Sequence, residues 1–328
     1  MNRRRLGRHG PQISVVGLGA WAIGGPWEWG WGATDDAESV AAIRHAVESG
    51  LNWIDTAAVY GHGHSEEVIG TALRELRPSE DVLVFTKCGQ PYAGPDGRSF
   101  GENLRPDSIR AECEQSLRRL GVERIDLYQF HWPDPGTPVE ESWSTMAELV
   151  DAGKVRWIGF CNATVDLLER CEAVRHVDSL QPPFNLLQGE ARDELIPWCR
   201  AYATGVIAYS PMASGLLTGA FDRERMASLA PDDWRHRSAL FQEPQLTRGL
   251  ELVDRLRPIA DRLGCSLATL AVAWTLAVPG VTGAIVGARR PAQIDDWLPA
   301  GDLELEKETL EEIELLLAGM SEVPGVSG

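Results

Sequence analysis

The chain lacks three features that would assign it to large classes of protein. It has no apolar run of about 18 residues, so no transmembrane helix is expected. Its six cysteines are scattered without a C-x-x-C pair, which indicates reduced thiols in a cytoplasmic protein. Basic residues are scarce, since 31 Lys and Arg stand against 48 Asp and Glu, a net charge of −17. A surface this acidic repels phosphate backbones and anionic lipids, so neither nucleic acid nor a membrane is expected as a partner.

The first 25 residues look at first like a signal peptide, because arginines precede an apolar stretch. However, Pro11, Gly17, Gly19 and the pair at 24–25 interrupt that stretch, and no A-x-A cleavage pattern follows. We therefore expect a β-hairpin followed by a strand, both part of the fold.

Short β-rich runs alternate with amphipathic helical patterns along nearly the whole chain. Thr34 as an N-cap, Pro106 in a first helical turn and Gly121 at a helix end are typical boundary residues. Strict alternation predicts right-handed βαβ units, and eight of them favour a closed (β/α)8 TIM barrel over an open sheet. No composition shift marks a linker, so residues 1–328 are expected to form one domain. The expected strands are 14–19, 51–56, 82–87, 124–131, 155–162, 179–185, 205–211 and 282–288, and the main helices are about 34–50, 65–76, 106–120, 138–152, 164–175, 244–263 and 266–277.

One short motif is typical of a different fold. Residues 17–22 read G-L-G-A-W-A, which matches the G-x-G-x-x-A turn of dinucleotide-binding Rossmann domains. That turn needs a helix directly after it, whereas G-G-P at 24–26 prevents one. We therefore interpret the glycines as places where the backbone packs closely against a loop or a ligand.

Polar residues stand at the ends of three consecutive predicted strands. Asp55 ends the second, Lys87 the third and His131 the fourth, and Tyr60 lies shortly beyond Asp55. Because neighbouring barrel strands are about 4.8 Å apart, the four side chains are expected to meet over the barrel mouth. Four unpaired polar groups in a buried mouth would be costly, so we interpret them as a catalytic site.

The residue types suit reduction of a carbonyl group. Lowering a tyrosine pKa by about 2 units from its reference value near 10 takes about 2.7 kcal/mol. The ammonium of Lys87, about 4 Å away, would supply about 4 kcal/mol at an effective dielectric of about 20. Asp55 would keep Lys87 charged and in place, while neutral His131 would hydrogen-bond a substrate oxygen. We expect Tyr60 to be a general acid and base next to a hydride source.

Four segments around these residues resemble the aldo-keto reductase family. They read GLNWIDTAAVYGHGHSEEVIGTAL, VFTKCG, IDLYQFHWPD and AYSPMASGLLTG, and the match runs in order from Leu6 to about Trp297. The resemblance implies a (β/α)8 barrel that binds NADP(H) without a Rossmann domain. It also implies Tyr60 as the general acid and base, tuned by Lys87 and Asp55, with His131 orienting the carbonyl.

The resemblance further implies residues for the coenzyme. Asn162 and Gln181 match the pair that hydrogen-bonds the nicotinamide carboxamide, and Tyr209 matches the ring that stacks on nicotinamide. The other implied positions lie at strand ends and in the loop that crosses the pyrophosphate: Gly19, Trp21, Asp55, Cys161, Ser210, Met212, Ser214, Gly215 and Leu216.

The segment after the last strand predicts a phosphate site. Gly287 leaves the strand, and Pro291 suits the first turn of a helix, whose N–H groups bind phosphate. Arg289 and Arg290 add charge there, which favours a 2′-phosphate and therefore NADPH over NADH.

At the adenine end, Gln293 matches the family pattern. The family commonly continues with Glu-Asn, where this chain has Asp296 and Trp297. We keep Asp296 in the coenzyme set, and we expect no metal. Trp27, Trp29 and Trp132 are expected to shape the site for a small carbonyl or alcohol, which suits an aldehyde, a ketone or a sugar.

Two other classes of function remain open. His62 and His64 form an H-x-H motif, which barrel hydrolases use with further His and Asp residues, such as His176 and Asp55, as metal ligands. Flanking glycines and the absence of further ligand spacing argue against this reading. The second alternative is a non-catalytic nucleotide-binding regulatory subunit, which a turnover assay would separate from an enzyme.

Overall fold

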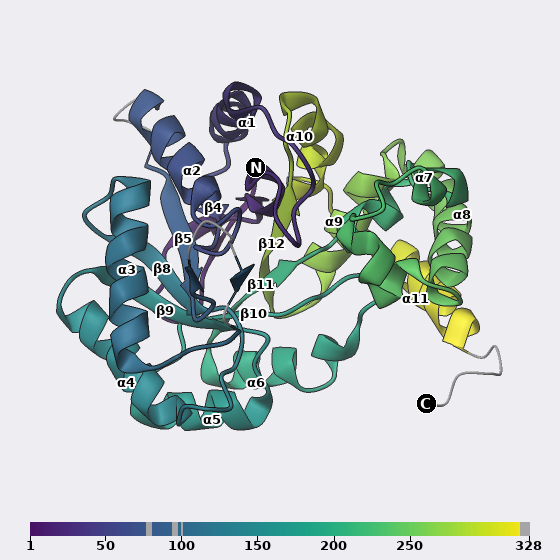
Figure 1. Ribbon diagram of the computed structural model, residues 1–328. Coiled ribbons are helices and arrows are strands. Elements are labelled where there is room, and N and C mark those ends of the chain that lie inside the picture. Colours follow the sequence, from purple (N-terminus) through teal and green to yellow (C-terminus); the bar gives the residue numbers. More distant parts are fainter. Residues whose placement is uncertain (77–80, 94–97, 100, 322–328) are drawn as a thin grey trace.

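The computed structural model describes residues 1–76, 81–93, 98–99 and 101–321. Within them, eight parallel strands close into a barrel, which confirms the predicted (β/α)8 fold (Figure 1). Each strand pairs with its neighbours along the chain, and the last pairs with the first. The barrel strands are β3 (Val16–Gly19), β4 (Trp53–Asp55), β5 (Leu83–Cys88), β8 (Ile125–Phe130), β9 (Val155–Cys161), β10 (Ser179–Gln181), β11 (Gly205–Tyr209) and β12 (Val281–Gly287).

Helices surround the barrel. The first five pack each on the next, and α10 packs on α1, while α8 and α11 lie together at one side of the barrel (Figure 1). Among the described residues no single helix has the length and apolar composition to cross a membrane, although α8 and α9, bent by 90°, pass that test as a pair. The helices are α1 (Asp36–Glu48), α2 (His64–Glu75), α3 (Pro106–Leu120), α4 (Val139–Asp151), α5 (Val165–Val174), α6 (Leu195–Tyr202), α7 (Arg223–Ala227), α8 (Gln245–Leu263), α9 (Leu267–Ala277), α10 (Pro291–Trp297) and α11 (Lys307–Ser321).

The predicted N-terminal hairpin is present as β1 (Arg3–Arg5) and β2 (Gln12–Ser14), which pair antiparallel. It covers the end of the barrel where the strands begin. Leu6 and Ile13 are fully buried and pack with residues of the barrel interior. A Cβ at Gly7 would lie only 2.8 Å from the oxygen of Asp178, just before β10, so glycine is needed for this close approach. Ligands are therefore left with the opposite end of the barrel.

Several predicted boundaries are wrong by a few residues. The N-cap of α1 is Asp35, whose side chain accepts the Glu38 N–H, and not Thr34. The predicted strand 179–185 keeps only β10, because two prolines at 182–183 have no N–H to donate. The strand predicted to reach residue 211 ends at Tyr209, since Ser210 turns into the left-handed region with a φ of +55°.

Candidate active site

A buried ion pair lies at the mouth of the barrel. Asp55 is the last residue of β4, and Lys87 lies one residue before the end of β5. Their side chains are 4% and 0% exposed, and Lys87 Nζ donates to Asp55 Oδ1 over 2.5 Å. Lys87 also donates to the main-chain oxygen of Thr56 at 2.8 Å. Both charges are out of solvent, so removal of either partner would leave a costly unpaired charge.

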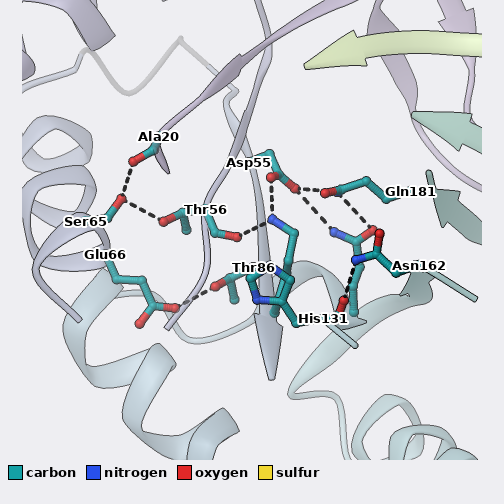
Figure 2. Close-up of polar contacts among 11 residues, drawn as sticks. Ala20, Asp55, Thr56, Ser65, Glu66, Thr86, His131, Asn162 and Gln181 are labelled. Atoms are coloured by element: carbon teal, nitrogen blue, oxygen red, sulfur yellow. Dashed lines mark hydrogen bonds and ion pairs between the residues drawn. The ribbon is translucent and has the colours of Figure 1, made fainter. Parts of the chain in front are cut away.

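Two glutamines hydrogen-bond the other oxygen of Asp55 (Figure 2). Gln181, at the end of β10, donates from Nε2 over 2.9 Å, and Gln129 of β8 donates over 3.3 Å. Gln129 is fully buried and was not predicted as a site residue, although a glutamine inside an apolar strand is an available signal. Asp55 thus accepts three side-chain donors, which fix its carboxylate and orient the ammonium of Lys87.

Tyr60 lies in the turn between β4 and α2, above Lys87. The ammonium of Lys87 is 5.2 Å from the centroid of its ring, and its charge lowers the pKa of the hydroxyl. The turn packs tightly against the loop that follows β3. A Cβ at Gly61, where φ is +60°, would lie 1.8 Å from the oxygen of Gly24, so only glycine allows this approach.

Burial controls the ionisation of the tyrosine. It raises the pKa of Tyr60 to about 12, and the charge of Lys87 offsets only part of that rise. The prediction that Lys87 brings this pKa below its usual value is therefore wrong, because desolvation and Asp55 oppose the ammonium. Burial lowers the pKa of Lys87, but Asp55, Tyr60 and Cys161 together raise it above its usual value, so the ammonium stays charged. At neutral pH the site holds a protonated hydroxyl beside a fixed cation.

His131 follows the last residue of β8 and faces the same space. Its ring centroid is 5.6 Å from that of Tyr60, with the rings nearly perpendicular at 77°. Burial and the charge of Lys87 hold the pKa of His131 well below its usual value, as expected for a neutral imidazole. A neutral ring carries one N–H donor and one acceptor, so it can donate one hydrogen bond to an oxygen.

Asn162 connects the two sides of the mouth. It follows β9 directly and has a φ of +58°, a conformation that asparagine tolerates better than most residues. Its Oδ1 accepts the Tyr209 hydroxyl at 2.8 Å, and its Nδ2 donates to the main-chain oxygen of His131 at 2.9 Å. The resemblance assigned Asn162 and Gln181 to one carboxamide, and the structure brings them to adjacent strand ends, where Asn162 N donates to Gln181 O.

A cavity of about 970 Å³ lies over these side chains. Much of its wall comes from the long segments after β3, β5 and β11. Tyr60 and His131 line it, together with the three tryptophans expected at the substrate site, Trp27, Trp29 and Trp132. The predicted coenzyme residues that line it are Gly19, Trp21, Asp55, Cys161, Asn162, Gln181, Tyr209, Ser210, Met212, Ser214, Gly215, Gly287, Arg289, Gln293 and Asp296.

Three predicted site residues do not line the cavity. Lys87 lies beneath it, fully buried. Leu216 is also fully buried, and a Cβ on Gly249 of α8 would lie 2.5 Å from its side chain. Arg290 precedes α10 with an exposed side chain. The two predicted arginines therefore differ, because only Arg289 faces the cavity.

Two further arginines line the end of the cavity near Arg289, and the sequence did not single them out. Arg225 of α7 and Arg235 come from the irregular segment between β11 and α8. The guanidinium of Arg235 lies 4.9 Å from the ring of Trp31, and Arg289 Nη1 donates to Trp31 O at 3.2 Å. Burial lowers the pKa of Arg289, and Arg290, Arg235 and Arg225 lower it further, which indicates a positive potential at this end.

The H-x-H motif does not converge on one point. His62 lines the cavity, where its ring is 5.2 Å from that of Tyr92 and 6.0 Å from that of Trp27. His64 is not among the lining residues and pairs with Asp36 at 2.9 Å. Across the described part of the chain, no three His, Cys, Asp or Glu side chains are placed to hold a metal ion.

The fold and the site together define a (β/α)8 barrel with a polar pocket at the carboxyl ends of its strands, the end where such barrels carry their active sites. The Aldo/keto reductase family model matches residues 15–318. The chain is 37% identical over 309 residues to the aldo-keto reductase YhdN of Bacillus subtilis (strain 168), which covers 94% of this chain and 91% of that protein.

Two other relatives point to the same family. The NADH-specific methylglyoxal reductase of Escherichia coli (strain K12) is 34% identical over 315 residues, 93% of this chain and 95% of that protein. The solved structure of a glycerol dehydrogenase from Gluconobacter oxydans matches with a TM-score of 0.89 and 36% identity, over 99% of this chain and 98% of that one. This chain therefore belongs to the aldo/keto reductase family, whose members are oxidoreductases that use nicotinamide coenzymes.

Proposed function

We propose that this protein is an NADP(H)-dependent oxidoreductase that interconverts a small carbonyl compound and the corresponding alcohol, with Tyr60 as general acid and base. One observation carries the proposal. The Tyr60 hydroxyl lies on the cavity wall beside the buried ammonium of Lys87, with the ring of His131 next to it. A hydroxyl that is protonated at neutral pH can donate its proton to a carbonyl oxygen.

The site residues then divide the work of reduction. A bound nicotinamide coenzyme supplies a hydride to the carbonyl carbon. The carbonyl oxygen becomes the alcohol oxygen and takes the proton of Tyr60. Lys87 stabilises the tyrosinate that remains, because its charge already lowers the pKa of that hydroxyl. Neutral His131 donates a hydrogen bond that orients the carbonyl.

The residues of the cavity fit a dinucleotide. In the loop after β11, three non-glycine residues have positive φ, Ser210 at +55°, Ala213 at +48° and Ser214 at +53°. Such strained backbone is concentrated at ligand sites. Trp31 lines the arginine end, and its buried Nε1 has no hydrogen-bond partner among the described residues. An orphaned donor beside guanidinium groups suits an oxygen-rich anionic ligand.

The preference for NADP(H) rests on the charges at that end of the cavity. Arg289, Arg235 and Arg225 all line it, in a protein whose net charge is −17. Arg235 is paired with Asp233 at 2.6 Å, and Arg225 has an exposed side chain. We therefore assign the 2′-phosphate to Arg289, which is partly buried in the cavity wall. One relative is named NADH-specific, so coenzyme preference varies within the family and needs a direct measurement.

The experiment measures initial rates with NADPH and NADH over a panel of aldehydes, ketones and sugars. In Arg289→Ala we expect the KM for NADPH to rise about tenfold, and that for NADH much less, since a charge-assisted hydrogen bond is lost. Arg290→Ala is the matched control, because its side chain is exposed and outside the cavity. Equal changes for both coenzymes in Arg289→Ala would refute the 2′-phosphate assignment. Absence of turnover with every carbonyl would favour the non-catalytic nucleotide-binding alternative.

A further inference from the structure

The outer side of β5 contacts two buried glutamates, although the inner side carries Lys87. Thr86 donates its hydroxyl to Glu66 Oε1 over 2.6 Å (Figure 2). Glu66 is fully buried in α2 and pairs with Arg119 Nε over 2.7 Å. Its charge is compensated, and the contact holds the strand from outside the barrel.

The second glutamate, Glu112 of α3, contacts the end of the same strand. It is 6% exposed, and its two oxygens accept the main-chain N–H of Gly89 at 3.1 and 3.3 Å. Its Oε1 also accepts the Ser108 hydroxyl at 3.1 Å. Unlike Glu66, which pairs with Arg119, Glu112 forms no ion pair with any residue that the structure describes. The buried carboxylate of Glu112 therefore serves mainly as the acceptor for one backbone amide, that of Gly89.

One peptide unit connects Glu112 to the site. The Gly89 N–H and the Cys88 carbonyl belong to the same planar unit. The Cys88 oxygen accepts the main-chain N–H of His131 over 3.0 Å. Gly89 has a φ of +92°, and a Cβ there would lie 2.4 Å from Leu104 Cδ2, so this turn is tight and needs glycine. Glu112 therefore accepts from the N–H of this peptide unit, while the carbonyl of the same unit accepts from His131.

We propose that Glu112 is a positioning residue for His131, acting through the Cys88–Gly89 peptide unit. The proposal rests on the proposed function, because that function is what His131 has to be positioned for. Glu112 does not line the cavity, so it touches neither substrate nor coenzyme there. Glu112 would act by fixing the position of the His131 main chain and, with it, the position of the imidazole.

The surroundings of Glu112 make this hold sensitive to pH. Burial raises the pKa of Glu112 to about 7, while the hydrogen bonds from Ser108 and Gly89 offset part of that rise. An ionised carboxylate is a stronger acceptor than a neutral one, so the hold weakens as pH falls through about 7. The titratable and charged groups that face it are Arg119 of its own helix, Glu66 of α2, Cys88 of β5, Tyr92 of β6 (Tyr92–Ala93) and Tyr128 of β8.

Two variants test the proposal. In Glu112→Ala we expect kcat for carbonyl reduction to fall about tenfold, since a displacement of about 1 Å can cost up to about 100-fold. The KM for the coenzyme should change less than about twofold, and amide hydrogen exchange should quicken at Gly89 and His131. Glu112→Gln keeps the shape and an acceptor oxygen. Because this acceptor is neutral at every pH, its kcat at about pH 8 should equal the lowered kcat expected of wild type below about pH 7 and exceed that of Glu112→Ala. Its pH profile should lack the fall in kcat expected of wild type as pH drops through about 7.

Asp126→Ala is the matched control. Asp126 is 8% exposed and accepts the Val84 N–H at 2.9 Å, near the opposite end of the same strand β5. Loss of the Asp126 carboxylate should lower the free energy of unfolding without changing kcat or its pH profile. Wild-type kcat and exchange in Glu112→Ala, or an equal loss of kcat in Asp126→Ala, would overturn the proposal.

Two complications are covered by the same measurements. If Glu112→Ala does not fold, the pH profile of Glu112→Gln decides, and a profile identical to that of wild type refutes the proposal. If wild type reduces no carbonyl, the proposed function fails by itself. Exchange at the His131 amide in the Glu112 variants then still decides whether Glu112 holds the peptide unit.

Discussion

The two ends of the barrel use buried carboxylates in different ways. Near the strand starts, Asp126 accepts the Val84 N–H at 2.9 Å and Asp178 accepts the Ile158 N–H at 3.0 Å. At the mouth, Asp55 accepts three side-chain donors, including a buried ammonium. The first two carboxylates hold main chain in place, and Arg156, which pairs with Asp126 at 3.2 Å, is 41% exposed. The third carboxylate holds a fully buried charge beneath a cavity. Glu112 stands between the two kinds, because it holds main chain but at the reactive end.

The interior of the barrel follows the same division. The part near the strand starts is apolar, with Leu6 of the hairpin region packed among Phe85, Leu127 and Ile207. The part near the mouth holds the buried polar groups that surround the ion pair of Asp55 and Lys87. Stability and chemistry are therefore carried by opposite ends, as is general for such barrels. Variants at the mouth should therefore change kcat and leave stability nearly intact, whereas variants at the strand starts should lower stability and leave kcat nearly intact.

The largest expected effect is at the mouth. Tyr60→Phe keeps the ring but removes the proton donor, so kcat should fall about 1000-fold, within the usual range for general acid–base catalysis. Coenzyme binding and the thermal unfolding midpoint should stay close to those of wild type. Steady-state kinetics and calorimetry check both. Turnover near that of wild type would contradict the comparison of the two ends, because the reaction at the mouth would then not need the Tyr60 hydroxyl.

A smaller effect is expected for the stability of Glu112→Gln. The pKa of Glu112 is raised from its usual 4.5 to about 7, so the folded protein binds a proton that the unfolded chain has released. Stability of wild type therefore falls as pH rises between these values, by up to about 3 kcal/mol. Glu112→Gln avoids this cost and should be more stable than wild type at about pH 8, and about equal at pH 4.5. Denaturant unfolding at both pH values measures the difference, and a gap that is the same at both would contradict it.

The smallest effect is expected at the strand starts. Asp126→Ala leaves the buried Val84 N–H without its acceptor, which should cost about 2 kcal/mol of unfolding free energy. The kcat should stay within about twofold of wild type, since the change is at the stabilising end of the barrel. Denaturant unfolding beside steady-state kinetics gives both values. A loss of kcat without a loss of stability would reverse the assignment of the two ends.

Strand ends and local patterns were enough to predict much of this architecture. The alternation of β and helical patterns predicted eight barrel strands, and the polar strand ends predicted that Asp55, Lys87 and His131 meet. Gln129 was missed because its importance depends on which strand lies beside β4 and β5 and on the alternation of side chains within β8. Arg235 was missed because its contact with Trp31 joins segments that are distant in sequence.

The sequence by itself determined the closed barrel, since the period of its apolar residues and its turn signals are local properties of the chain. It also determined which chemical groups stand at the carboxyl ends of the strands. Only the tertiary structure decided how those groups ionise, because desolvation depends on everything packed around them. Burial outweighs the ammonium at Tyr60, and the same effect brings Glu112, which lies outside the cavity, to a pKa near neutrality.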